Sequence, residues 1–481
     1  MVSQVVAKAM GKILGRLPVR LNVGVMIFLS CMTSYMLRVN FSIAILAMVV
    51  PSSPSLLNGT DITGVLTVKD YGPRYHWSSS QQGLLLGSYF WGYLISALPG
   101  TWLVEKYGGK ILITTSFALS VVVTALAPLF ASWGFYAMYI SRFITGFLSG
   151  PHYAAFHNII SKWAPPEEKG KFMGSLMGGT FGTVITLPIV GLLIENVSWA
   201  TGFYIPAVVT GIICLLWHLI VADKPNVHSF IKPEEKDYIE KALGTSVSKE
   251  KPKPPIRQIL TSIPFIALVI LHFSNLWGLF FLMTAAPKFM NVVLNFNLSQ
   301  SGFLSALPYL ARLTCGILFG YIGDFVRNRK WLSVTNIRKV FTIFSHILPG
   351  LFLALLCFIT EPYACVAVIT ASLGFNGAVS ITNLQNSHDL APNFAGLLYG
   401  IMNFVGTTPG FISPIIVSYF TEDGNTMAEW SNVFIVGCVI YVLPALIYMM
   451  LGSGETQPWN EPLPEGEKNK DKQQNSSEKT A

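Results

Sequence analysis

Long apolar stretches alternate with short polar ones along almost the whole chain. A helix needs about 20 apolar residues to cross roughly 30 Å of hydrocarbon, and six runs of that kind fall in each half of the sequence. They lie near residues 21–50, 81–103, 111–131, 134–160, 173–194 and 200–221, and near 264–287, 302–323, 340–360, 363–387, 395–419 and 432–451. The pattern predicts an all-α membrane protein whose twelve transmembrane helices form two six-helix bundles.

The polar segments around these runs set the predicted domain boundaries. Residues 1–20 form a short basic N-terminus, and the two bundles occupy residues 21–222 and 258–451. Residues 223–257, rich in Lys, Glu and Pro, are too polar to enter a bilayer and are predicted to link the bundles. Residues 452–481 are charged and lack hydrophobic periodicity, which predicts a disordered tail.

The charged residues set the predicted orientation. Only 12% of the residues are charged against 52% hydrophobic, which argues against a water-soluble protein. The net charge of +8 would suggest nucleic acid in a soluble chain, but here the basic residues lie in short loops, so no nucleic-acid partner is expected. Only Lys69, Arg74 and Lys288 lie in loops on the side away from the termini, which places both termini in the cytoplasm.

Further expectations concern the protein's modification, location and partners. Asn58, in the sequon Asn58-Gly59-Thr60, lies in a long non-cytoplasmic loop and is the predicted glycosylation site. The tail carries no clear sorting signal, so we expect the plasma membrane, with a lysosomal or vesicular membrane as the alternative. We expect a monomer whose partners are the lipid bilayer and a small anion.

The chain lacks the motifs of soluble enzymes and of ATP-driven pumps. It has no Walker loop, no GxSxG and no HExxH. All six cysteines lie in apolar runs without metal-ligand spacing, so neither a disulfide framework nor a metal site is predicted. We therefore expect that the protein is not an enzyme and has no cofactor. We expect transport to be driven by an ion gradient or by the membrane potential.

Three arginines lie inside predicted spans, whereas acidic residues lie outside them or, as with Glu195 and Asp389, at their ends. A charge at the bilayer centre costs about 2.5 to 3.5 kcal/mol, so embedded arginines face the bundle interior or a watery cavity. Without carboxylate partners, Arg38, Arg142 and Arg312 point to an anionic substrate. The alternatives are a snorkelling Arg38, an Arg142 bound to backbone carbonyls and an Arg312 that serves packing. His157 follows Arg142 by about four helical turns, so the two share roughly one face of an unbroken helix.

Several segments resemble a known family. A degenerate loop motif of the major facilitator fold follows the second run (Glu105 to Lys110) and the eighth (Gly320 to Asp324, with basic residues after it). More specific segments are YMLRVNFSIAILAMV (35–49), LGSYFWGYLISALPG (86–100), KWAPPEEKGK (162–171), GFLSALPYL (302–310) and SGETQPW (453–459). They resemble the solute-carrier branch of sodium-phosphate cotransporters, sialin and vesicular glutamate transporters.

The resemblance assigns roles to single residues. Arg38 matches the first-span arginine that this family uses in anion transport, and Arg142 and His157 match residues of its fourth span. The chain departs from the pattern at Ser149, where organic-anion members have a glutamate tied to proton coupling, and at Asn275, where glutamate carriers have an arginine. We keep Asn275 among the candidate substrate contacts, with Arg38, Arg142, His157 and Arg312.

Apart from these two departures, the chain is similar to the family members known as inorganic phosphate cotransporters of invertebrate type, for which sodium drives uptake. The leading hypothesis is therefore sodium-dependent phosphate symport by alternating access. The candidate coupling-ion ligands are neutral oxygens of Asn383, Asn386 and Asn403 near the interface of the bundles. The alternatives are a lysosomal or vesicular carrier of an organic anion such as sialate or glutamate, and a non-transporting receptor or scaffold.

Overall fold

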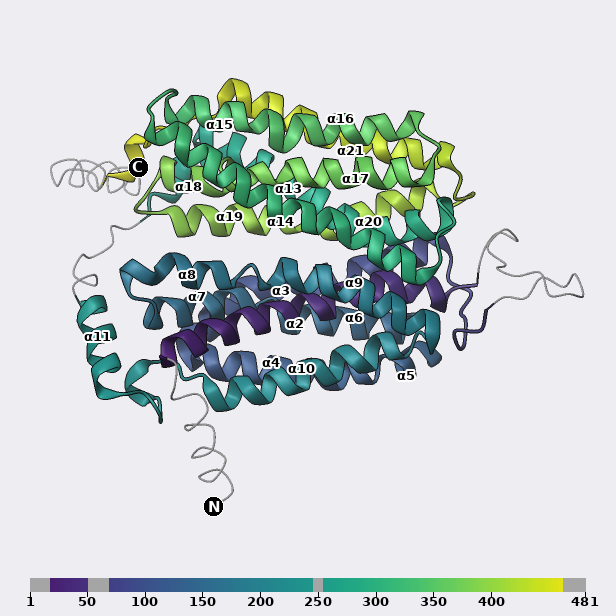
Figure 1. Ribbon diagram of the computed structural model, residues 1–481, viewed down its shortest axis with the longest axis horizontal. Coiled ribbons are helices and arrows are strands. Elements are labelled where there is room, and N and C mark those ends of the chain that lie inside the picture. Colours follow the sequence, from purple (N-terminus) through teal and green to yellow (C-terminus); the bar gives the residue numbers. More distant parts are fainter. Residues whose placement is uncertain (1–17, 51–68, 245–253, 462–481) are drawn as a thin grey trace, which may run out of the picture.

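The computed structural model describes residues 18–50, 69–244 and 254–461. Its helices form two bundles that lie side by side with their long axes roughly parallel (Figure 1). The N-terminal half is drawn in purple to teal and the C-terminal half in green to yellow. The predicted all-α architecture of two helical bundles is confirmed.

The N-terminal half begins with α2, which starts at Val19, and ends with α10, which stops at Ile220. Its fourth predicted span is broken between α6 and α7 at Gly150-Pro151, since proline has no N–H to continue the helical ladder. The helices are α2 (Val19–Met48), α3 (Ser79–Tyr107), α4 (Gly109–Ala125), α5 (Ala127–Ser132), α6 (Phe135–Ser149), α7 (His152–Trp163), α8 (Lys169–Ser175), α9 (Gly178–Asn196) and α10 (Thr201–Ile220).

The C-terminal half follows the same plan, again with several spans divided into two helices. A π-helical turn at Phe289–Val293 ends its seventh span, and another at Ile343–Ile347 interrupts its ninth. The helices are α12 (Ile256–Thr261), α13 (Ile263–Lys288), α14 (Leu298–Asn328), α15 (Val334–Thr342), α16 (Leu348–Leu355), α17 (Pro362–Asn376), α18 (Asn383–Leu390), α19 (Ala395–Thr407), α20 (Pro409–Phe420) and α21 (Met427–Leu451).

Within the described residues, nine stretches of helix are long and apolar enough to cross a membrane. The other three predicted spans are also helical: α3 forms one, α4 with α5 the second, and α6 with α7 the third. The order of elements therefore agrees with twelve spans in two sets of six.

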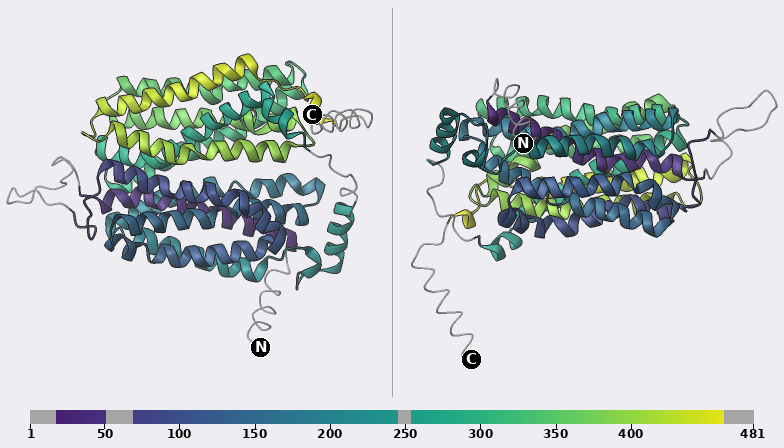
Figure 2. Two further views of the ribbon diagram at one scale, coloured as in Figure 1. Left: turned by 180° about the vertical axis from the view of Figure 1, so that it is seen from behind. Right: turned by 90° about the horizontal axis from the view of Figure 1, so that it is seen from below.

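The predicted linker contains a helix that its composition alone did not indicate. Helix α11 (Pro233–Gly244) lies across one end of the N-terminal half (Figure 2). Its Glu235 accepts hydrogen bonds from the backbone N–H groups of Val19, at 3.0 Å, and Arg20, at 3.1 Å, and so caps the start of α2. The Arg20 guanidinium also pairs with Glu168 at 2.8 Å and with Glu235 at 3.2 Å. The first part of the linker thus packs as a piece of the N-terminal half.

We call the end of the molecule that carries α11 and both ends of the described chain the linker face, and the other end the opposite face (Figures 1 and 2). Hydrogen bonds tie the two halves together at the opposite face. Lys288 of α13 donates to Ser79 Oγ at 3.2 Å and to Thr421 Oγ1 at 3.0 Å. Glu195 of α9 accepts from the Leu298 N–H of α14 at 3.2 Å. In this conformation the opposite face is closed.

Close helix packing next to these hydrogen bonds also keeps the opposite face closed. A Cβ atom added to Gly83 of α3 would lie 2.1 Å from Ser418 Oγ on α20, so only glycine lets these helices approach so closely. The rings of Trp91 and Phe411 stack across the same helix pair with centroids 3.8 Å apart. At Gly174 of α8, by contrast, an added Cβ would meet no atom within 4 Å.

The tail is ordered at its beginning, contrary to the predicted disorder of the whole segment. Residues 452–461 dock on the linker face, where the Gly454 N–H donates to Thr335 Oγ1 at 2.9 Å and the Gln457 N–H donates to the Leu390 carbonyl at 2.8 Å. The prediction was wrong here because it rested on the charge and periodicity of the segment itself, whereas residues 452–461 satisfy backbone groups on a surface that other helices provide.

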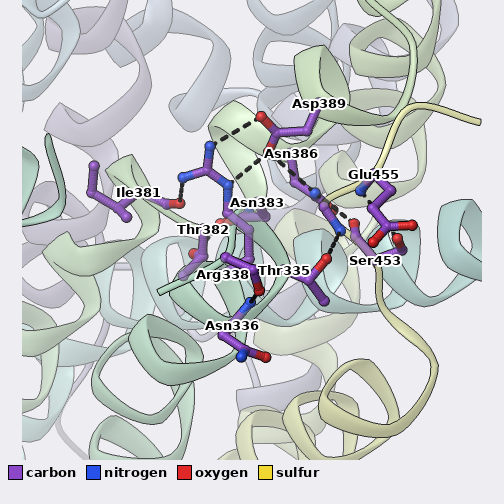
Figure 3. A network of polar contacts seen from close by, with 12 residues as sticks. Thr335, Asn336, Arg338, Ile381, Thr382, Asn383, Asn386, Asp389, Ser453 and Glu455 are labelled. Carbon is purple, nitrogen blue, oxygen red and sulfur yellow. Dashed lines mark hydrogen bonds and ion pairs between the residues drawn. The ribbon is translucent and has the colours of Figure 1, made fainter. Parts of the chain in front are cut away.

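A buried ion pair lies under the docked tail (Figure 3). The Arg338 guanidinium of α15, only 2% exposed, donates from Nε to Asp389 Oδ2 at 2.7 Å and from Nη2 to Oδ1 at 3.1 Å. Its Nη1 donates to the Ile381 carbonyl at 2.5 Å. Asn386 joins this network to the tail by donating to the Ser453 carbonyl at 2.8 Å. The pair thus connects α15, α18 and the tail.

Three sequence predictions fall outside the described residues. They are the glycosylation site at Asn58, most of the basic N-terminus, and the tail beyond residue 461.

Candidate anion-binding site

Arg38 lies in α2 among aromatic rings and is buried, with 7% of its surface exposed. Its neighbour Tyr35 is one helical turn earlier on the same face. The rings come from both halves, since Phe280 belongs to α13. Measured from the guanidinium carbon, the ring centroids lie at 4.5 Å (Tyr35), 4.9 Å (Tyr93), 5.2 Å (Tyr89), 5.7 Å (Phe90) and 5.8 Å (Phe280).

No carboxylate neutralises this guanidinium in the described part of the chain. The ion pairs found there involve Arg20, Lys69 and Arg338, and none includes Arg38, Arg142 or Arg312. Among the described residues, the Nε atoms of Arg38, Arg142 and Arg312 are all buried without a hydrogen-bond partner. Aromatic faces stabilise a cation only partly, so a buried guanidinium with a spare donor is suited to bind an anion.

Arg142 binds the backbone of α2 beside Arg38. Its Nη1 donates to the Leu37 carbonyl at 3.1 Å and its Nη2 to the Arg38 carbonyl at 3.2 Å. The guanidinium also lies 4.9 Å from the ring centroid of Phe41. These contacts match the alternative in which Arg142 binds backbone carbonyls.

Replacing Arg142 by lysine should lower the free energy of unfolding by about 1 to 3 kcal/mol, because one ammonium cannot satisfy both carbonyls in the fork geometry of a guanidinium. Thermal unfolding of the purified protein in detergent would measure the loss. Arg327→Lys, at an exposed position of the linker face, is the matched control. Equal stability of the two variants would contradict the backbone role.

Arg312 of α14 and Asn275 of α13 meet in the C-terminal half. The Arg312 Nη2 donates to Asn275 Oδ1 at 3.2 Å. A guanidinium therefore lies beside residue 275, the position where the resemblance gives glutamate carriers an arginine, although here it comes from a different helix. Phe280, on the same helix as Asn275, has its ring centroid 5.8 Å from the Arg38 guanidinium carbon, so α13 contacts both arginines.

His157 lies apart from these residues. It is exposed on α7, beyond the break at Gly150-Pro151, and its charged neighbour is Lys169. A shared face for His157 and Arg142 required an unbroken helix. In the described part of the chain no hydrogen bond links His157 to the site. The buried His152 instead bridges Ser34 Oγ at 3.0 Å and Ser116 Oγ at 2.7 Å, so both its nitrogens serve packing.

The three asparagines proposed as coupling-ion ligands have different partners. Asn383 Nδ2 contacts His272 Nδ1 at 2.8 Å. Asn386 accepts from the Tyr448 hydroxyl at 2.8 Å and belongs to the network under the tail. The backbone carbonyl of Asn403 accepts from Thr407 at 2.8 Å. These hydrogen bonds do not bring the three side chains to one point.

Sequence reasoning missed most of the aromatic surroundings of Arg38. The spacing of Tyr35 was a usable signal because residues three apart face the same side of a helix. Tyr93 and Phe280 gave no such signal, since they reach the site from α3 and α13 only through the packing of the helices.

Comparison with known proteins fits this architecture. Residues 23–414 match the family model described as Major Facilitator Superfamily. A bacterial homolog to the human lysosomal transporter Spinster, solved in an inward-facing and occupied conformation, aligns with a TM-score of 0.67 at 13% identity, over 90% of this chain and 97% of its own. The fold and the family match define a secondary transporter of the major facilitator superfamily.

The sequence relatives narrow the class. Sialin from Ovis aries is 36% identical over 92% of this chain and 90% of its own length. Vesicular glutamate transporter 3 from Danio rerio is 31% identical over 93% of this chain and 75% of its own. The chain therefore belongs to the family of sialin and the vesicular glutamate transporters, which are transporters and not enzymes.

Proposed function

We propose that this protein carries a small oxyanion across a membrane by alternating access, with Arg38 of the N-terminal half and Arg312 of the C-terminal half binding the anion from two sides. The observation that carries the proposal is the buried guanidinium of Arg38, which lies at the meeting point of both halves and pairs with no carboxylate of the described residues. An anion would neutralise both cations and favour closure of the halves around it.

The closed opposite face corresponds to one end state of such a cycle. The excess of Lys and Arg on the linker face supports a cytoplasmic linker face and cytoplasmic termini. The state described would then open toward the cytoplasm, and the ties of Lys288 and Glu195 would break when the carrier opens to the other side.

Two substrate classes follow from different observations. The relatives support an organic anion, since one is named for glutamate, and they support a vesicular or lysosomal membrane rather than the expected plasma membrane. Ser149 supports the alternative of sodium-driven phosphate symport, because it replaces the glutamate that the resemblance gives to organic-anion members and so leaves no carboxylate there to carry a proton. The serine is buried, and its hydroxyl donates to the Thr145 carbonyl at 2.9 Å.

Reconstituted protein would decide between them. Uptake of phosphate, sialate and glutamate should be compared in liposomes under imposed sodium, proton and voltage gradients. Accumulation of any of these anions supports the carrier, and its absence under every gradient would favour a receptor or scaffold. If sodium drives transport, collapsing the proton gradient at fixed voltage should barely change uptake; a strict proton requirement favours the organic-anion class.

Arg312→Gln should weaken substrate affinity by about tenfold, the effect of losing one charge-assisted hydrogen bond to a bound anion. The measurement is the concentration of substrate that gives half-maximal uptake, normalised to the amount of folded protein in the membrane. Arg327→Gln on the exposed linker face is the control. Unchanged affinity, or loss of folded protein alone, would assign Arg312 to packing.

A further inference from the structure

Glu195 lies in the last turn of α9 at the opposite face, where its carboxylate makes three contacts. Lys69 Nζ lies 2.6 Å from Oε1, and the Tyr71 hydroxyl donates to Oε2 at 3.0 Å. The third donor is the Leu298 N–H, at 3.2 Å from Oε2. Leu298 is the first residue of α14 in the other half, so this hydrogen bond joins the two halves.

The hydrogen bond between the Leu298 N–H and Glu195 favours the ionised form of the carboxylate. The first N–H groups of a helix have no partner inside it, and the helix dipole favours an anion there. A hydrogen bond to an ionised carboxylate is roughly twice as strong as one between neutral groups. The hydrogen bonds made by Lys288 join its Nζ to two hydroxyls. The hydrogen bond between Glu195 and Leu298, by contrast, depends on a negative charge that acid removes.

We propose that Glu195 is a gating residue: its ionised carboxylate holds the opposite face closed, and its protonation from the compartment on that side releases α14 and favours opening. This inference concerns the gate alone and does not depend on which anion is carried. A neutral acid would lose the ion pair with Lys69 and would accept the Leu298 N–H less strongly.

The groups around Glu195 are consistent with a carboxylate switch. Lys69 and Tyr71 face it from the loop before α3, and Arg74 is held in the same loop by the Lys69 carbonyl at 2.7 Å. The first turn of α14 carries no charged side chain. Burial, followed by the neighbouring Glu195 carboxylate, raises the pKa of Tyr71 above its ordinary value, so this hydroxyl remains a donor throughout the physiological range.

The switch would change rates and not the driving force. A proton that binds and leaves on the same side at each opening carries no net charge across the membrane. Acid in that compartment would speed opening even though Ser149 provides no proton carrier in the substrate site.

Accessibility of a cysteine below the gate would test the proposal without substrate. Ser42 of α2 is 3% exposed and lines a cavity of about 20 Å³ beside Lys288 and Ser418. Ser42→Cys would be introduced into a chain in which the partly exposed cysteines are serine (Cys315, Cys357 and Cys438). A membrane-impermeant thiol reagent is then applied to sealed vesicles whose opposite face points outward.

Labelling should accelerate about tenfold when the outer solution is acidified from about pH 7.5 to about pH 4, below the pKa of about 4.3 of a free glutamate, because the ion pair and the stronger hydrogen bond are lost with the charge. Glu195→Gln mimics the protonated acid, so its labelling should be fast at both pH values. Glu361→Gln is the matched control, because Glu361 caps α17 at the same face within the C-terminal half. It should keep the normal acid response.

Tyr71→Phe gives a second test, since it removes one donor and keeps the carboxylate. Its acid response should persist with a midpoint at higher pH, a shift that a purely structural role would not produce. The proposal would be overturned by pH-independent labelling of the unsubstituted gate, by an unaltered acid response in Glu195→Gln, or by loss of the response in Glu361→Gln. Should Glu195→Gln fail to fold, an unchanged midpoint in Tyr71→Phe would overturn the proposal.

Discussion

Replacing Arg38 by lysine should reduce transport by more than tenfold while leaving a folded protein in the membrane. Lysine keeps the positive charge, but its compact ammonium cannot offer the planar fork of donors that grips an oxyanion from one side. The lost bidentate contact corresponds to a barrier increase of about 1.4 kcal/mol or more. The aromatic rings at 4.5 to 5.8 Å would still surround a cation, so folding should suffer little.

Initial uptake rates, normalised to protein delivered to the membrane, measure this effect. Arg327→Lys makes the same chemical change on the exposed linker face and should transport normally. Wild-type uptake by Arg38→Lys would remove Arg38 from the binding site. A parallel loss of thermal stability would assign it to packing beside Arg142.

The architecture was readable from the sequence because membrane burial imposes a simple rule. Each apolar run long enough to cross the bilayer must satisfy its backbone within a helix, so the apolar runs alone predicted the helices and their two sets. The interruption of the fourth span could also have been predicted from Gly150-Pro151. That His157 would then lie apart from the buried arginines could not. The direction of a side chain beyond a break depends on how the two helix pieces pack.

The site was only partly predictable for a related reason. The cost of burying charge singled out Arg38, Arg142 and Arg312, but the role of each depends on neighbours from distant segments. Backbone carbonyls were one alternative for Arg142, but no side-chain pattern could show that they are those of Leu37 and Arg38. The ordered start of the tail has the same origin, because its partners belong to α15 and α18.

The second large effect concerns Arg338, whose pairing with Asp389 is buried under the docked tail. Arg338→Met should lower the free energy of unfolding by about 3 to 5 kcal/mol, because it leaves a carboxylate and the Ile381 carbonyl without their main donor. Thermal unfolding in detergent measures the loss, and Arg327→Met should change little.

The double variant Arg338→Met with Asp389→Leu distinguishes the net contribution of the ion pair to the free energy of unfolding from the loss caused by leaving one buried charge unpaired. Two apolar side chains of similar volume remove both buried charges, and such replacements are often neutral or stabilising. We therefore expect the double variant to regain most of the lost stability. Asn386 should keep its bonds to Tyr448 and Ser453, so the tail should stay docked and residues 453–459 should stay protected from proteolysis. If the double variant is no more stable than Arg338→Met, the ion pair itself is needed to hold α15, α18 and the tail together.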